Sequence, residues 1–123
     1  MNLTLLHSDN RGQIYTITGD GLSYPEIAMF TTNEGFARGG CIHEESDEYT
    51  CVISGSVKYQ IGIDSVILKL GESTVIPKNT PHYFVSLTDS VVLEWGAKPE
   101  EKKAKHRRFR QRVDKINDNQ HTP

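Results

Sequence analysis

The sequence predicts an all-β fold in a single domain, followed by one C-terminal helix. Two observations carry this prediction. Short segments with strand-like alternation fill residues 1–97, with a turn signal roughly every six to ten residues and no helical periodicity among them. After Gly96 the composition changes abruptly to Lys, Arg, Glu and Gln, which favour helix. A chain of 123 residues is long enough to bury one hydrophobic core.

Each expected strand is bounded by turn residues such as Gly, Asn, Asp and Pro. Within Glu48–Ile53, alternation places Thr50 and Val52 on one face and the residues between them on the other. A short apolar run precedes the first turn, at 8–12. We expect strands at Gln13–Thr18, Ile27–Thr32, Ala37–His43, Glu48–Ile53, Val57–Ile63, Val66–Leu70, Ser73–Ile76, His82–Leu87 and Ser90–Trp95.

Residues 98–123 are predicted to form a basic C-terminal helix, from Pro99 to Asn117, and a tail. Residues 98–112 contain eight Lys or Arg and two Glu, which leaves a net charge of about −8 for the rest of the chain. Phe109, Val113 and Ile116 form a narrow apolar stripe that can dock on the β-domain or on a partner subunit. Single-strand binders interleave basic residues with stacking aromatics, and Phe109 is the one aromatic here, so we expect no nucleic-acid role.

The composition indicates a protein of the cytoplasm. Hydrophobic residues make up 36% and charged residues 24%, and no apolar run approaches the roughly 20 residues that span a bilayer. The first residues lack the basic start and the cleavage site of a secretory signal. We therefore expect reduced cysteines. A Cys41–Cys51 disulfide is also disfavoured, because Cys51 faces away if Glu48 and Cys41 both point inward.

The residues best suited to chemistry gather in the segment Gly35–Gly55. Cys41 and His43 are two positions apart, so they share a face of an extended strand, and Glu48 follows a short acidic turn. His82 begins a later strand. A thiol, two imidazoles and a carboxylate are side chains that bind a divalent metal or transfer protons.

Two spaced motifs resemble those of the cupin superfamily, over roughly residues 10–97. The resemblance implies a small antiparallel jelly-roll barrel (a double-stranded β-helix), with the site inside its mouth. It assigns the cupin domain to residues 1–97 and leaves 98–123 as an appended helix and tail. The first motif is carried by Gly35, Cys41, His43, Glu48 and Gly55, and the second by Gly71, Pro77, Asn79, His82 and Ser86. Asn79 takes the place of a usual glycine, and Ser86 that of a usual asparagine.

In metal-dependent cupins the matching positions hold a divalent ion. The resemblance therefore implies a site of Cys41, His43, Glu48 and His82 for Zn, Fe, Ni or Mn. Cys41 stands where the family has a histidine. It can serve as a thiolate ligand, or it can be a small buried apolar residue in a chain that binds no metal.

A narrower resemblance points to the nucleotide-sugar epimerases and ketoisomerases of this superfamily, which work without metal. It rests on the segment D-N-R-G-Q-I at 9–14 and on R-G-G-C-I-H at 38–43. It implies substrate-binding roles for Arg11 and Arg38. Arg38 lies at opposite strand parity to Cys41, so it faces away from the pocket unless a bulge intervenes.

In those enzymes a histidine at the position of Cys41 acts as, or beside, the catalytic base. Cys41 cannot do this in the same way, so His43 is the natural substitute, in a site that also holds His82. Histidine is the side chain closest to a base poised at neutral pH. Glu45 or Glu48 would orient His43, Tyr59 or Tyr83 would act as the acid, and Trp95 would line the substrate site.

Three functions remain open. The first is a sugar or nucleotide-sugar isomerase or epimerase that uses His43 and His82. The second is a divalent-metal-dependent cupin enzyme, and the third is a non-catalytic ligand-binding or regulatory cupin. In each case we expect a homodimer, since exposed sheet edges favour pairing.

Overall fold

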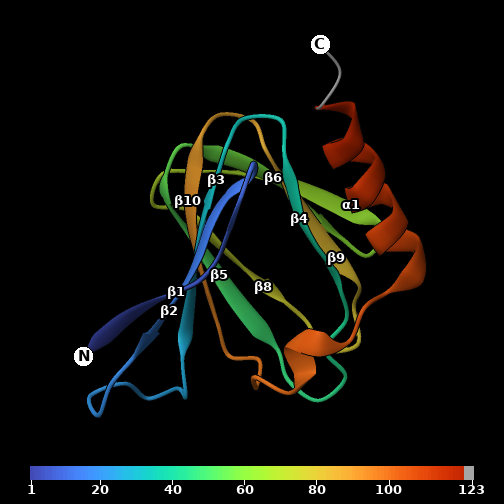
Figure 1. Ribbon diagram of the computed structural model, residues 1–123. Coiled ribbons are helices and arrows are strands. Elements are labelled where there is room, and N and C mark those ends of the chain that lie inside the picture. Colours follow the sequence, from blue (N-terminus) through green and yellow to red (C-terminus); the bar gives the residue numbers. More distant parts are fainter. Residues whose placement is uncertain (121–123) are drawn as a thin grey trace.

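The computed structural model describes residues 1–120 and shows two antiparallel β-sheets and one C-terminal helix (Figure 1). The last residues of the predicted tail, 121–123, lie outside the described residues. The strands are β1 Asn2–Asp9, β2 Gly12–Thr18, β3 Ile27–Thr32, β4 Ala37–Cys41, β5 Glu48–Ser54, β6 Ser56–Ile61, β7 Asp64–Lys69, β8 Ser73–Ile76, β9 His82–Ser86 and β10 Ser90–Trp95. They are followed by a short 3₁₀ helix, η1 Glu101–Lys103, and by α1 Arg107–Asn119.

The strands form a six-stranded sheet in the order β1-β2-β3-β10-β5-β8 and a four-stranded sheet in the order β4-β9-β6-β7. The all-β class with one C-terminal helix is therefore confirmed. Within residues 1–120 the strand ladders form two separate sheets, so the closed barrel implied by the motifs is matched only in part. No helix among the described residues is long and apolar enough to cross a membrane.

The core lies between the two sheets and consists of the inward-facing residues of alternating strands. Glu48, Thr50 and Val52 on β5 are buried, as the predicted alternation requires. Both cysteines are free thiols, as expected. The central cluster is Val52, Val57, Tyr59, Leu68, Ile76, Phe84 and Val92.

The C-terminal segment differs from the predicted single helix beginning at Pro99. After η1 the backbone is extended at Ala104 and His106, and α1 begins only at Arg107. The interruption arises because this backbone bonds to β4 and the residue that follows it: the Ala104 carbonyl accepts from the Ile42 N–H, and the His106 N–H donates to the Gly40 carbonyl. Tertiary hydrogen bonds thus override helix propensity at these positions.

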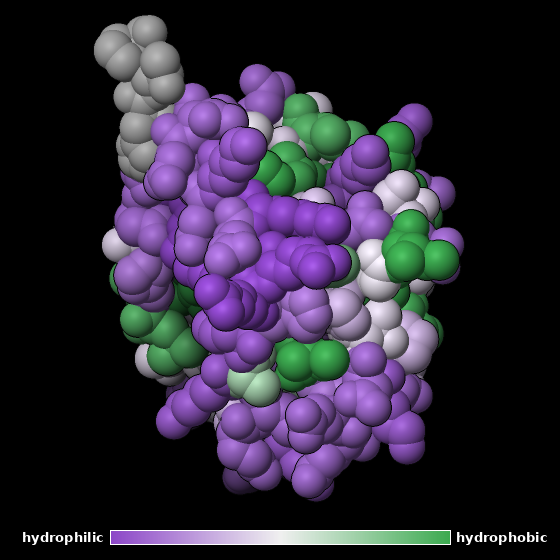
Figure 2. All heavy atoms as spheres, turned by 90° about the vertical axis from the view of Figure 1, so that its right-hand side faces the viewer, coloured by the Kyte–Doolittle hydropathy of each residue, from purple (hydrophilic) through white to green (hydrophobic). Residues whose placement is uncertain are grey.

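Helix α1 packs along β4 at the edge of the four-stranded sheet (Figure 1). Phe109 and Val113 are buried in this contact, while the opposite side of the helix is exposed. Figure 2 shows that hydrophilic side chains cover most of this face of the molecule.

Gly40 makes the close approach of α1 to β4 possible. Its φ of 82° lies in the left-handed region that favours glycine. A Cβ at this position would lie 2.7 Å from the Cα atom of Arg110, which is closer than real contacts allow. The first turns of α1 can therefore pack this close to β4 only because residue 40 is a glycine.

Gly40→Ala is expected to lower the free energy of unfolding by about 2–4 kcal/mol, because it adds left-handed strain and a backbone clash. The matched control is Gly21→Ala, since a Cβ at Gly21 would meet nothing within 4 Å and its φ lies outside the left-handed region. Urea unfolding of both variants measures the difference. Equal stability of the two variants would contradict the close approach.

Candidate functional site

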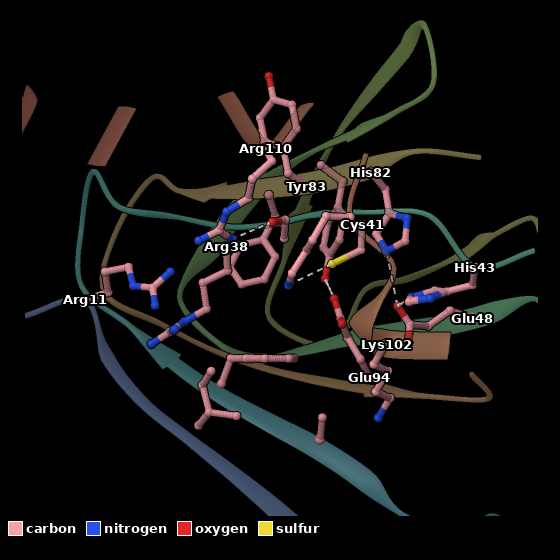
Figure 3. Close-up of a pocket in the computed structure, with 17 residues that line it drawn as sticks. Arg11, Arg38, Cys41, His43, Glu48, His82, Tyr83, Glu94, Lys102 and Arg110 are labelled. Atoms are coloured by element: carbon pink, nitrogen blue, oxygen red, sulfur yellow. Dashed lines mark hydrogen bonds and ion pairs between the residues drawn. The ribbon is translucent and has the colours of Figure 1, made fainter. Parts of the chain in front are cut away.

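A pocket of about 300 Å³ opens between the two sheets and is closed on one side by the C-terminal segment. Its wall takes residues from β2, β3, β4, β5, β6, β9 and β10, together with Lys102, Lys105 and Arg110. Figure 3 shows the side chains that line it. Both sequence motifs contribute to this one pocket.

Three of the predicted metal ligands meet there. His43, Glu48 and His82 are all buried, and one donor atom from each lies within 4.8 Å of the others. The Nε2 atoms of His43 and of His82 each lie 3.3 Å from Oε1 of Glu48. Donor atoms roughly 2.0–2.2 Å from one metal ion are about 3 Å apart, so these positions fit a common divalent ion.

The backbone holds both imidazoles in the orientation that a ligand needs. Nδ1 of His43 lies 3.2 Å from the Glu101 carbonyl oxygen, and Nδ1 of His82 lies 3.0 Å from that of Thr80. A carbonyl only accepts, so we place the N–H at Nδ1 in both rings. In the neutral imidazole Nε2 then carries a lone pair. Such outer contacts are typical of metal-bound histidines.

The centre of this group is built to hold positive charge. Oε1 of Glu48 is buried and has no hydrogen-bond partner within residues 1–120, although two Nε2 atoms face it. Two lone pairs and a carboxylate oxygen repel one another unless positive charge lies between them. A divalent metal fits this set, and so does a proton on one histidine.

The charges of the group respond to one another. Burial opposes ionisation of Glu48, but the two histidines outweigh burial and lower the pKa of Glu48 to about 2. Burial also opposes protonation of His82, yet the Glu48 carboxylate outweighs it and raises the pKa of His82. The group therefore favours a bound cation at neutral pH.

Asn79 links the two motifs. Its N–H donates to the His43 carbonyl at 2.6 Å, and its φ of 65° is the left-handed conformation for which the family uses glycine. Asn is among the few other residues that adopt this conformation readily. The substitution noted in the sequence thus keeps the local geometry.

Cys41 does not join the three other predicted ligands. It borders the pocket, but its sulfur lies outside the group formed by His43, Glu48 and His82. Its sulfur instead accepts a hydrogen bond from Nζ of Lys105, 3.8 Å away. Burial raises the pKa of the Cys41 thiol, which disfavours the thiolate that a metal requires.

A second acid faces the same pocket from β10. Glu94 accepts a hydrogen bond of 2.5 Å from the Tyr59 hydroxyl, which lies 2.8 Å from Oγ1 of Thr50. Burial, and then the charge of Glu48, raise the pKa of Glu94 to about 7. Burial also raises the pKa of Tyr59, so its hydroxyl stays protonated and donates to Glu94. Glu94 can therefore take or give a proton near neutral pH.

A family model of the cupin domain matches residues 29–95. The chain belongs to the cupin family. The match covers both motifs and every residue of the His43–Glu48–His82 group. The recognition of the superfamily from the two motifs is thereby confirmed.

Solved structures of other proteins share this fold at low sequence identity. CapF, a capsular polysaccharide assembling protein from Staphylococcus aureus, aligns with a TM-score of 0.68 at 17% identity over 85% of this chain and 32% of its own. KdgF from a Halomonas species aligns with a TM-score of 0.64 at 18% identity, over 78% of this chain and 88% of its own. A transcriptional regulator of the HTH_3 family from Vibrio cholerae aligns with a TM-score of 0.60 at 22% identity, over 71% of this chain and 51% of its own. At these identities the likeness shows the fold alone.

This cupin spans about a third of the CapF chain. A search of curated proteins gives no match.

Arg11 and Arg38 both border the cupin pocket. Arg38 faces inward because the β4–β9 register shifts between Gly39 and Cys41, which lets Arg38 and Cys41 line the same side. The bulge that strand parity required is therefore present. Arg11 is bound to Asp9, with Nη2 2.8 Å from Oδ2.

Two other predicted residues lie outside the pocket, and a third lies at its border. Glu45 is exposed and pairs with Lys98 at 3.3 Å, and Trp95 stacks on Tyr49 with ring centroids 6.0 Å apart. Neither lines the pocket. Trp95 faces away because side chains alternate along β10 and Glu94 points inward. Tyr83 borders the pocket, but its ring packs edge-on against Phe109 of α1.

Sequence reasoning missed four polar residues of the pocket: Glu94, Lys102, Lys105 and Arg110. Glu94 had a signal, since it shares the inward parity of Val92 in a strand that is otherwise apolar. The three basic residues had none, because their placement depends on how the C-terminal segment folds back over the pocket.

Proposed function

We propose that this cupin is a divalent-metal-dependent enzyme that moves a proton on a small carbohydrate-like substrate, as an isomerase or epimerase does. The observation that carries the proposal is the convergence of two fixed Nε2 atoms on the unpartnered Oε1 of Glu48. His43, Glu48 and His82 would hold the ion, and Zn, Fe, Ni or Mn suits this ligand set. A metal bound there supplies Lewis-acid polarisation of a substrate oxygen.

The proton transfer is assigned to Glu94. Its carboxyl faces the same pocket, and in the metal-free chain burial, followed by the charge of Glu48, raises its pKa to about 7. Burial is the larger cause and does not depend on the metal, and the raised pKa suits a group that takes a proton and returns it. The Tyr59 hydroxyl donates to Oε2 and so fixes the orientation of the carboxyl. Tyr59 thus positions Glu94, in place of the acid role proposed from the sequence. CapF, named for capsular polysaccharide assembly, is consistent with carbohydrate chemistry on this fold.

Metal analysis of protein purified without chelator tests the metal. We expect about one ion per chain. Less than a tenth of an ion in every preparation, including those supplied with Zn, Fe, Ni or Mn, would overturn the metal-dependent function. Incubation with candidate sugars in D₂O, followed by NMR, tests the proton transfer through uptake of deuterium at carbon.

The metal-free isomerase remains the second candidate, and the raised pKa of His82 favours it. In that case an imidazolium at His82 neutralises Glu48, and His43 or Glu94 acts as base. Full deuterium exchange by protein stripped of metal would select this candidate.

We also retain the predicted homodimer, the jelly-roll interpretation of the strand order and the cytoplasmic location. Leu3, Leu5 and Leu6 are exposed on β1, an edge strand of the six-stranded sheet, as expected for a surface that a second copy covers. Light scattering should give twice the 13.9 kDa of the chain, and the monomer mass would contradict this prediction.

A further inference from the structure

Arg38 is a buried cation with no carboxylate partner among residues 1–120. Its relative exposure is 3%, and Nε and Nη2 donate to Oγ1 of Thr32 and to the Thr31 carbonyl at 2.9 and 3.1 Å. Nη1 is buried and has no partner among residues 1–120. The hydrogen bonds of Nε and Nη2 are explained by a structural role, since they connect β4 to β3. No such contact explains the burial of Nη1. Burying a guanidinium without an anion is costly.

The nearest charged neighbours do not neutralise Arg38. Burial, and then the charge of Arg11, lower the pKa of Arg38 to about 10, so it remains a cation at neutral pH. The Asp9 carboxylate is held by Arg11 through Nε and Nη2 at 2.8–3.3 Å. The pocket wall beside Arg38 therefore has an excess of positive charge.

Arg110 adds another cation from α1. Its Nη1 donates to the Gly39 carbonyl at 3.0 Å and its Nε lies 3.3 Å from Oδ1 of Asp114, whose side chain is more than half exposed. These contacts hold the guanidinium at the edge of the pocket, and an exposed pair of this kind is weak enough for a ligand to compete with it. Figure 3 shows Arg11, Arg38 and Arg110 at one end and His43, Glu48 and His82 at the other. We call the first group the arginine end.

Charge and size together define the ligand. Five Lys or Arg and two Glu line the pocket. Three of these cations pair with carboxylates outside the lining: Arg11 with Asp9, Lys102 with Glu26 and Arg110 with Asp114. Arg38 has no such pair among residues 1–120, so the charge left uncompensated at the arginine end is positive. The pocket volume of about 300 Å³ is at the lower limit for small-ligand pockets, which favours a single sugar ring over a nucleotide sugar.

We infer that the arginine end binds the acidic group of a monosaccharide-sized substrate, a carboxylate or a phosphate monoester, with Arg38 Nη1 and Arg110 as its donors. The C-terminal helix is then part of the binding site. Arginine is suited to this role because its fork of N–H groups matches both anions. The inference rests on the proposed function in one respect, namely that the pocket takes a small-molecule substrate.

Calorimetric titration tests this with hexuronates, hexose phosphates and the matching neutral hexoses. We expect one acid class to bind and the neutral sugars not to bind, and the class that binds distinguishes carboxylate from phosphate. Arg110→Gln should weaken binding by about 10- to 100-fold, the loss expected for one charge-assisted contact. Arg108→Gln, an equal charge change at an exposed position of α1, should leave it unchanged.

Arg38→Lys serves as a second variant, since it keeps the charge but removes the fork. Equal effects of Arg110→Gln and Arg108→Gln, or no binding of any acid up to millimolar concentration, would overturn the inference. Metal content measured on the same samples keeps the two hypotheses apart: acid binding by a chain without metal overturns the metal-dependent function alone. Metal binding with no response to Arg110→Gln overturns the arginine end alone.

Discussion

His82→Ala is expected to abolish stoichiometric metal binding. It removes one of the three donor atoms that converge within 4.8 Å, and it leaves Nε2 of His43 and Oε1 of Glu48 as the remaining pair. Loss of an outer contact typically costs 10- to 100-fold in metal affinity, so loss of a ligand should cost about 100-fold or more. Metal content after dialysis, and a competition titration with a chromophoric chelator, measure the effect.

Cys41→Ser is the informative control, because Cys41 is the fourth ligand that the cupin motif implies. Its sulfur lies outside the group, so metal content should be unchanged. Circular dichroism checks that both variants remain folded. Loss of metal in Cys41→Ser with retention in His82→Ala would contradict the three-residue site. The affinity for metal should also decrease as the pH is lowered, because the ion must displace the proton that Glu48 helps His82 to hold.

Glu94→Gln is expected to change activity and stability in opposite directions. Glutamine still accepts from the Tyr59 hydroxyl but cannot take a proton, so turnover should fall by about 10²- to 10⁴-fold. The control Tyr59→Phe removes only the contact that positions Glu94 and should retain part of the turnover. A Glu94→Gln variant with full turnover would exclude Glu94 as the proton carrier.

The stability effect follows from the raised pKa of Glu94. The folded protein holds this proton up to a pKa of about 7, whereas the unfolded chain releases it near the ordinary value of 4.5. Stability of the metal-free wild type should therefore fall between these two pH values, and Glu94→Gln should escape that loss. At pH 8 the variant should be more stable by on the order of 2–3 kcal/mol, with no difference from this source at pH 4.

Chemical denaturation of metal-free protein at the two pH values measures the difference. Glu34→Gln, at an exposed position, should follow the wild type at both. A Glu94→Gln variant that is less stable than the wild type at pH 8 would show that the carboxylate is stabilised in the folded protein. Active sites commonly contain groups that lower stability because their pKa is shifted toward the value that catalysis needs.

The local pattern of the chain predicted most of the strands. Alternation within Glu48–Ile53 placed Thr50 and Val52 on one face of the strand, and turn residues marked the strand ends, because these signals act over a few residues. β1 was expected only as a short apolar run, since its residues are largely exposed and its pairing with β2 decides its conformation. The C-terminal helix was predicted too long, because backbone bonds from Ala104 and His106 to residues 40–42 interrupt it.

What the sequence by itself determined is the cupin fold and the meeting of His43, Glu48 and His82. The resemblance of the two spaced motifs to the cupin family implied that these residues meet, with Glu48 and His82 at the starts of β5 and β9 and His43 just after β4. Only the tertiary structure decided which other side chains enter the pocket. One extra residue at Gly40 turns Arg38 inward, Cys41 stays outside the ligand group, and the folded-back C-terminal segment supplies Arg110. A shift of one residue reverses the facing of a strand, and contacts between distant segments leave no local trace, so neither could be predicted from the sequence.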